Sequence, residues 1–226
     1  MTGPSTDPWV VIAAYNEGNR LAATLQTLAN YHTIVVDDGS VDDTFEVARR
    51  HATWVLKHPI NCGQGAALQT GIDFALSKGA AAMITFDADG QHDASEIPDL
   101  VAPVNSGEAD VVLGSRFMGR TVNMPASRRW LLRSAILFTR LTNGLRLTDT
   151  HNGFRCLSAD AARRIRIRQP RMAHASEILD QIARLKLRYR EVPVTISYSE
   201  ESLAKGQRTG DAIRIGSDLL LDRVWR

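Results

Sequence analysis

The feature that most constrains the fold of this sequence is an alternation of short apolar runs with amphipathic stretches through its first half. The apolar runs are continuous and rich in Val and Ile, which is typical of strands buried on both faces. They cover Trp9–Tyr15, His32–Asp38, Ala52–His58, Ala81–Asp89 and Ala109–Arg116. The amphipathic stretches predict helices over Gly18–Ala29, Asp43–His51, Gly65–Ser77 and Ser95–Val104. Strands that alternate with helices predict an α/β fold with a mostly parallel sheet.

The second half of the chain predicts further helices and two more strands. The expected elements are a helix with basic and apolar faces over residues 128–145, a short strand and a helix over 152–165, a helix and a strand over 174–198, and a closing helix over 217–226. Asp42 or Asp43, and Ser95, are the expected N-caps of two helices in the first half. Because no linker separates the two halves, we expect one domain over residues 1–226.

Composition and charge exclude several classes of protein. The chain is 44% hydrophobic and 23% charged, which is ordinary for a globular protein with a sizeable core. Its formal net charge of +2 gives no polybasic signal for nucleic acid. No run approaches the ~20 apolar residues that span a bilayer. Cys62 and Cys156 have no metal-ligand spacing and indicate free thiols in a reducing compartment, so we expect a cytoplasmic protein.

Polar clusters follow three of the predicted strands. They are Tyr15-Asn16-Glu17, Asp37-Asp38-Gly39-Ser40 and Asp87-Ala88-Asp89. One acidic strand end is usually only a loop cap. Ligands of parallel α/β sheets bind at the carboxyl ends of the strands, however, so three clusters at one edge predict a single cleft.

The third cluster has the chemistry of a metal site. Asp87 and Asp89 are two residues apart, so in an extended segment their side chains point the same way. Two carboxylates this close repel each other unless a cation lies between them. Hard oxygen ligands suit Mg²⁺ or Mn²⁺, and Gln91 can add a neutral oxygen on the same side.

Other kinds of site share parts of this pattern. A calcium-binding EF-hand loop starting at Asp87 would need Gly and Glu where His92 and Pro98 stand, so it is excluded. A phosphatase with an aspartyl nucleophile also carries an acidic pair after an apolar strand, but that motif usually opens the chain and has Thr or Val where Gln91 stands. Dinucleotide binding through residues 63–68 is a weak alternative, because Leu68 replaces the third glycine of the fingerprint.

Six segments in order give the sequence a family resemblance. They are AAYNE, VVDDGS, NCGQGAALQTG, FDADGQHD, GSRF and NGFR. Together they resemble the family 2 glycosyltransferases of GT-A fold, and in particular the dolichyl- and polyprenyl-phosphate mannose or glucose synthases. The resemblance covers residues 9–200. It implies a Rossmann-like, mostly parallel sheet flanked by helices, with a nucleotide-sugar half over residues 9–115 and a helical acceptor half over 116–226.

The resemblance also implies roles for individual residues. The nucleotide sugar is expected to contact Ala13, Tyr15, Glu17, Val36, Asp38, Asp87, Ala88 and Asp89. Ala13 stands where the family usually has Pro. The metal, Mg²⁺ or Mn²⁺, is expected at Asp87, Asp89 and Gln91. In the polar segment 201–210, Lys205 or Arg208 is expected to close over the diphosphate, the alternative being an exposed loop.

The acceptor side is expected to be basic. The resemblance implies that Arg116 and an Arg of the next helix receive the acceptor phosphate, with Arg129 as the first choice and Arg133 as the second. Asp89, Arg116 and Arg129 are therefore the expected catalytic residues. A solvated helix face is the alternative for the helix arginines. Two weaker candidates are His151 and Glu177. The alternative for His151 is a hydrogen-bonded histidine at the surface, and the alternative for Glu177 is a solvated glutamate on a helix face.

The expected activity follows from this set of residues. It is a metal-dependent, inverting transfer of a hexose from a GDP- or UDP-sugar to a polyprenyl phosphate. Such an acceptor is already an anionic nucleophile that needs positioning by Arg rather than a strong base. Peripheral contact with the inner face of the plasma membrane is expected through residues 128–141 or the C-terminal segment. The alternatives are a soluble acceptor or a non-catalytic nucleotide-sugar binding module.

Overall fold

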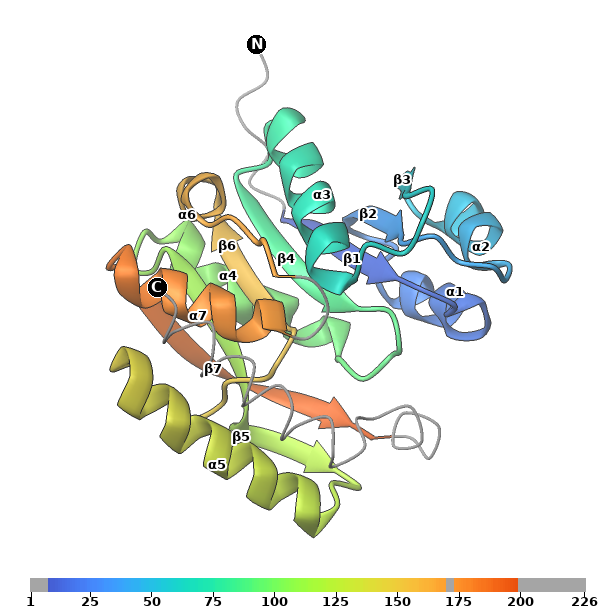
Figure 1. Cartoon of the computed structure of the whole chain (residues 1–226). Coiled ribbons are helices and arrows are strands. Elements are labelled where there is room, and N and C mark those ends of the chain that lie inside the picture. Colours follow the sequence, from blue (N-terminus) through green and yellow to red (C-terminus); the bar gives the residue numbers. More distant parts are fainter. Residues whose placement is uncertain (1–7, 170–172, 199–226) are drawn as a thin grey trace.

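The computed structural model describes residues 8–169 and 173–198 and centres on one seven-stranded sheet with the order β3-β2-β1-β4-β6-β5-β7 (Figure 1). The strands are β1 Trp9–Ala14, β2 His32–Asp37, β3 Trp54–Lys57, β4 Ala82–Asp87, β5 Val111–Val122, β6 Arg155–Ser158 and β7 Tyr189–Ser197. Only β6 runs antiparallel to its neighbours, β4 and β5, while the other adjacent strands pair in parallel. The predicted α/β class with a mostly parallel sheet is confirmed.

Helices cover both faces of the sheet. They are α1 Gly18–Thr27, α2 Thr44–His51, α3 Gln64–Ser77, the 3₁₀ turn η1 Ala94–Glu96, α4 Ile97–Asn105, α5 Ala126–Asn143, α6 Ala159–Arg164 and α7 His174–Arg184. Residues of α3, α6 and α7 share one apolar core, and residues of α1 and α4 share the other. Alternate residues of β1, such as Val10 and Val11, enter opposite cores, as the period of a strand requires.

The start of α4 differs from the prediction. Ser95 does not cap this helix, because the 3₁₀ turn η1 precedes it and moves the cap upstream. Asp93 caps that turn, and its side chain accepts the backbone N–H of Ser95 at 2.9 Å. At α2 the residue in the N-cap position is Asp43, but the carboxylate of Asp42 accepts the N–H of Thr44. The predicted closing helix over residues 217–226 lies outside the described residues.

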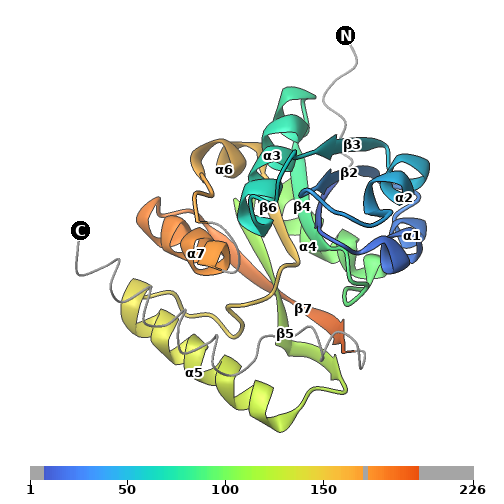
Figure 2. The ribbon, with the colours of Figure 1, turned by 45° about the vertical axis from the view of Figure 1, so that its right-hand side comes forward.

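Strand β5 and helix α5 lie near the end of the sheet opposite β3 (Figures 1 and 2). β5 continues past a register shift between Ser115 and Arg120 and stays paired with β7 up to Val122. On α5, Trp130 is 73% exposed and Leu137 is 60% exposed. In the described part of the chain, no helix is both long enough and apolar enough to cross a bilayer.

The sheet register brings the predicted polar clusters to one edge. Ala13 pairs with Asp87 of β4, and Ala14 pairs with Asp37 of β2. Because all three strands are parallel, the residues that follow them emerge side by side. The sheet therefore builds the cleft that the sequence predicts.

Candidate active site

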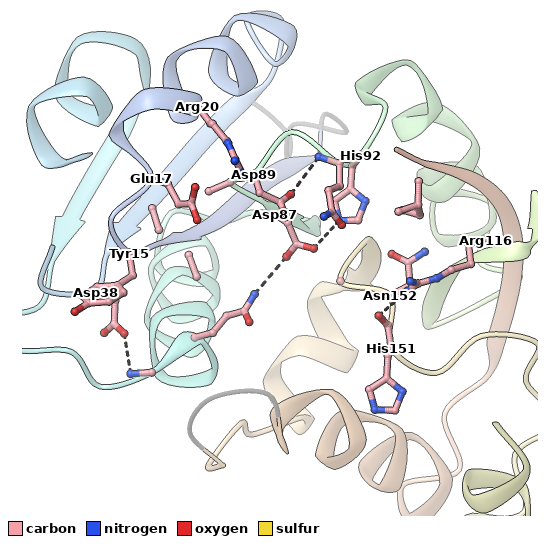
Figure 3. Close-up of a pocket in the computed structure, with 18 of the residues that line it drawn as sticks. Tyr15, Glu17, Arg20, Asp38, Asp87, Asp89, His92, Arg116, His151 and Asn152 are labelled. Carbon is pink, nitrogen blue, oxygen red and sulfur yellow. Dashed lines mark hydrogen bonds and ion pairs between the residues drawn. The ribbon is translucent and has the colours of Figure 1, made fainter. Parts of the chain in front are cut away.

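A cleft of about 410 Å³ lies at the carboxyl ends of β1, β2 and β4. It brings together most of the residues expected at the nucleotide sugar and metal. They are Ala13, Tyr15, Glu17, Asp38, Asp87, Ala88, Asp89 and Gln91. Figure 3 shows Tyr15 and Asp38 at one end, the acidic pair in the middle, and Arg116 with His151 at the other end. One cavity thus joins an acidic centre to a basic end.

Two of the residues expected to contact the nucleotide sugar, Val36 and Lys205, are not among the described residues that line the cleft. Val36 does not line the cleft. It is fully buried in the core on the α3 side, because it lies within β2, two residues before Asp38, where the core covers its side chain. Lys205 lies outside the described residues, as does Arg208.

The acidic pair is held by hydrogen bonds on both carboxylates. Asp87 Oδ2 lies 2.9 Å from His92 Nε2, and Asp87 Oδ1 accepts Gln64 Nε2 at 3.3 Å. Asp89 Oδ1 accepts the backbone N–H of Gln91 at 3.1 Å. These contacts fix the direction of both side chains before any ligand binds.

The two carboxyls have different affinities for protons. Burial raises the pKa of Asp87, but the surrounding positive charge, that of His92 above all, outweighs it and holds the pKa below its usual value. Burial and the negative charge of Asp87 raise the pKa of Asp89 to about 6. The pair therefore carries concentrated negative charge that a bound cation would relieve.

Asp38 is a buried acceptor at the end of the cleft where the nucleotide is expected. Its Oδ1 accepts the backbone N–H of Cys62 at 2.9 Å, and its Oδ2 accepts that of Gly63 at 2.7 Å. His58 Nδ1 lies 2.8 Å from the same Oδ1. Asp38 thus fixes the loop before α3, of which Asn61 and Gly63 line the cleft, as does Gln64 at the start of α3.

Arg116 lines the cleft, but it is only 6% exposed and also holds the cleft wall. Its Nε donates to Asp149 Oδ2, its Nη1 to the hydroxyl of Tyr198 and its Nη2 to the carbonyl of His151, each at 2.6 Å. Nη1 and Nη2 each carry a second N–H. Arg116 therefore positions the loop 149–153 and keeps donors for a ligand.

The helix arginine at the cleft is Arg128. Its guanidinium carbon lies 4.9 Å from the centre of the Tyr198 ring, and the residue lines the cavity. Arg129 and Arg133, the two expected residues, are exposed and do not line it. Neighbouring residues of a helix point in directions about 100° apart, and the sequence does not say which of them faces inward.

Of the two weaker candidates, His151 lies at the cleft and Glu177 does not. His151 lines the cleft, and burial together with the charge of Arg155 lowers its pKa to about 4, so the ring is neutral near pH 7. Glu177 does not line it. Its Oε2 accepts the backbone N–H groups of Arg168 and Gln169 at 2.9 and 2.8 Å, so it holds the segment before α7.

Several cleft residues were missed by the sequence reasoning. They are Arg20, Asn61, Gln64, His92 and Ile196. The segments that carry the family resemblance contain several of the cleft residues, namely Asn61, Gln64, His92 and Asn152. Their position in these segments is the sequence signal that points to the site. Within the described residues, His92 Nδ1 and Asn152 Nδ2 are buried and have no hydrogen-bond partner. Buried polar atoms without a partner are uncommon in native proteins and often mark a functional site.

Comparisons with known proteins identify the family of this chain. Residues 9–165 match the family described as Glycosyl transferase family 2. The chain is 30% identical to the UDP-N-acetylglucosamine–dolichyl-phosphate N-acetylglucosaminyltransferase of Methanococcus voltae, over 96% of each protein. It is 33% identical to the undecaprenyl-phosphate mannosyltransferase of Micrococcus luteus, over 90% of this chain and 89% of that protein.

A solved structure shares the fold. It is glucosyl-3-phosphoglycerate synthase from Mycobacterium tuberculosis, in complex with Mn²⁺ and uridine-diphosphate-glucose. The TM-score is 0.71 at 18% identity, over 95% of this chain and 76% of that one. The sheet, the family match over most of the chain and the named relatives lead to one conclusion: the chain belongs to glycosyl transferase family 2 and is a glycosyltransferase of GT-A fold.

Proposed function

We propose that this enzyme transfers a hexose, with inversion, from a GDP- or UDP-sugar to a polyprenyl phosphate, with Mg²⁺ or Mn²⁺ as cofactor. The observation that carries the proposal is the single cleft in which the pair Asp87 and Asp89 faces the basic wall formed by Arg116 and Arg128. Such a cleft can hold a metal-bound diphosphate and bring a second phosphate to it without repulsion.

The nucleotide is expected at the end formed by β1 and β2. Tyr15 is 45% exposed and offers a ring for the base, while Glu17 and Asp38 offer acceptors for N–H and O–H groups. Because Asp38 also fixes the loop before α3, its carboxylate is set in place before the nucleotide arrives. Ala13 and Ala88 line the floor and leave room for the ribose.

The residues around the acidic pair fit a divalent metal. Asp87, Asp89 and Gln91 supply hard oxygen donors in one cavity, and the raised pKa of Asp89 reflects its burial beside the negative charge of Asp87. A metal held there would supply Lewis-acid stabilisation of the diphosphate leaving group. The Mn²⁺ complex of the structural neighbour supports this assignment.

The acceptor is expected at the basic end. The spare donors of Arg116 and the guanidinium of Arg128 can orient an anionic nucleophile without removing a proton from it. His151 is neutral near pH 7 and therefore adds no charge to this end. Lys205 remains a proposed diphosphate ligand that closes the cleft from the C-terminal segment.

A lipid-linked acceptor is supported by two observations. The two named relatives act, by name, on dolichyl phosphate and undecaprenyl phosphate. From Arg116 to Thr148 the chain has seven arginines and no Asp or Glu, and Trp130 and Leu137 are exposed within this stretch. A basic surface with exposed apolar side chains favours peripheral contact with an anionic membrane.

A soluble acceptor is the second candidate. It is favoured by the structural neighbour, which has also been solved in complex with UDP and glucosyl-3-phosphoglycerate. Both candidates use an acceptor with a phosphate, so the basic end of the cleft does not separate them.

The test is a product assay with labelled GDP-mannose, UDP-glucose and UDP-N-acetylglucosamine. Each donor is offered a short-chain polyprenyl phosphate in detergent or 3-phosphoglycerate in buffer. We expect lipid-linked product from one donor, absent in Asp89→Asn. Product on 3-phosphoglycerate alone would replace the lipid acceptor with a soluble one.

A further inference from the structure

Three side chains of metal-ligand type lie close together where Asp38 borders the cleft. A carboxylate oxygen of Asp38, a ring nitrogen of His58 and the sulfur of Cys62 all lie within 4.8 Å of one another. They come from the end of β2, the residue after β3 and the loop before α3, so chain spacing alone does not reveal the cluster. The sequence reasoning treated Cys62 as a free thiol.

The donor set differs in kind from that of the acidic pair. A thiolate, an imidazole and a carboxylate are the ligands that Zn²⁺ prefers, commonly with water in a fourth, tetrahedral position. Oxygen donors at Asp87, Asp89 and Gln91 suit Mg²⁺ or Mn²⁺ instead. We propose that Asp38, His58 and Cys62 form a second metal site, selective for Zn²⁺ and similar borderline-soft cations, that lowers nucleotide affinity when occupied.

The surroundings of His58 suit a ligand role. Metal-bound histidines almost always use their second nitrogen for a hydrogen bond that orients the ring. His58 Nε2 lies 3.0 Å from Thr70 Oγ1, and a hydroxyl can either donate or accept. In the metal-free protein Nδ1–H donates to Asp38; with metal on Nδ1, the proton moves to Nε2 and is donated to Thr70.

The exposure of the three side chains and the forms in which they bind metal also suit a metal site. The Asp38 carboxylate is buried and the His58 side chain is 15% exposed, but Cys62 is exposed and opens the site to solvent. A metal binds the thiolate form of cysteine and an unprotonated imidazole nitrogen, so Cys62 and His58 can both act as ligands.

The site is joined to the cleft through Asp38. Metal on Oδ1 must loosen the hydrogen bond from Cys62 N, which fixes the loop whose residues Asn61 and Gly63 line the cavity. It also occupies the carboxylate expected at the base. This coupling, unlike the metal site itself, rests on the proposed nucleotide-binding function.

The metal site can be tested without any substrate. Full-length protein is titrated with Co²⁺, whose bond to thiolate gives a near-ultraviolet charge-transfer absorption, and Zn²⁺ is then added to displace it. Asp87→Asn/Asp89→Asn serves as the background, so that the acidic pair does not compete. Cys62→Ala keeps the backbone N–H that binds Asp38, so this variant is expected to fold. Cys156→Ala is the matched thiol control.

We expect the absorption in the background protein and with Cys156→Ala. It should be lost with Cys62→Ala, with Co²⁺ binding weakened by more than about tenfold, since even the loss of an outer partner costs that much. Absence of thiolate absorption in the background protein, or equal Co²⁺ affinity with Cys62→Ala, would overturn the site.

A second arm tests the coupling. The affinities for UDP and GDP are measured in Mg²⁺ with and without Zn²⁺, in the otherwise wild-type chain and in Cys62→Ala. We expect Zn²⁺ to weaken binding in the former only; equal effects in both would overturn the coupling. If neither chain binds either nucleotide, the proposed function fails, whereas the cobalt spectrum still decides the metal site.

Discussion

The carboxylate of Asp87 lies directly over the α-carbon of Gly153. A Cβ atom at Gly153 would come within 2.7 Å of both carboxylate oxygens. Gly153 is also tied to β4, because Thr85 Oγ1 donates to its carbonyl oxygen. The loop that Arg116 holds therefore packs against Asp87, so the two walls of the cleft are in direct contact.

Gly153→Ala is expected to displace Asp87 and lower kcat/KM by at least about tenfold, because small misplacements of a catalytic group are costly. The matched control is Gly79→Ala, where the new methyl meets nothing within 4 Å but the backbone has a φ of +85°. The control should lose stability and keep activity. Thermal melts and steady-state rates separate the two effects, and full activity in Gly153→Ala would contradict the proposed contact.

Arg128 and Arg129 are neighbours on α5 with different surroundings, which makes them a matched pair. Arg128→Gln should lower acceptor kcat/KM roughly ten- to a hundredfold, the effect of losing a hydrogen bond to a charged group. Arg129→Gln should change it less than about threefold, because an exposed charge is worth little. Arg128→Lys should recover part of the loss. A larger loss of acceptor kcat/KM in Arg129→Gln than in Arg128→Gln would instead assign acceptor binding to Arg129.

Asp38→Asn should weaken binding of nucleoside diphosphates roughly ten- to a hundredfold, because the amide no longer accepts as a charged group. Asp99→Asn, at an exposed position on α4, is the control. Calorimetry with UDP and GDP measures the change. Affinity equal to that of the parent protein would remove Asp38 from the nucleotide site.

His151 gives the protein a specific pH dependence of stability. Its pKa is lowered from 6.5 to about 4 by burial and the charge of Arg155, so between these values the unfolded chain binds a proton that the folded chain does not. The free energy of unfolding should therefore fall as the pH drops from 6.5 towards 4. His151→Gln should flatten this part of the curve in denaturant titrations. An unchanged slope would mean that the ring is protonated in the folded protein.

The parallel part of the fold could be predicted from local pattern. Strands β1 to β4 and the first part of β5 lie in short apolar runs, and helices α1 to α4 lie between them with an apolar stripe, so the sequence predicts the type and order of these elements. The polar residues after β1, β2 and β4 could be placed in one cleft because parallel strands end at the same edge. Asp87, Asp89 and Asp38 follow from this reasoning.

The rest depends on contacts that the sequence pattern does not encode. Strand β6 inserts antiparallel between β4 and β5, and nothing in Arg155–Ser158 specifies its direction. The side chain of Val36, two residues before Asp38, is buried in the core on the α3 side, and the pattern of the strand does not show where the core ends and the cleft begins. The choice among Arg128, Arg129 and Arg133 stays open in the sequence, because the inward face of α5 depends on how the helix packs beside Tyr198.

Metal dependence of transfer tests the central proposal most directly. Transfer of labelled hexose from a nucleotide sugar to a short-chain polyprenyl phosphate is measured in Mn²⁺, in Mg²⁺ and in EDTA, for the parent enzyme and for Asp89→Asn. The proposal predicts product only with a divalent metal and only in the parent enzyme, while both proteins show the same circular dichroism and melting behaviour. Equal transfer in EDTA and in Mn²⁺, or full activity in Asp89→Asn, would contradict it.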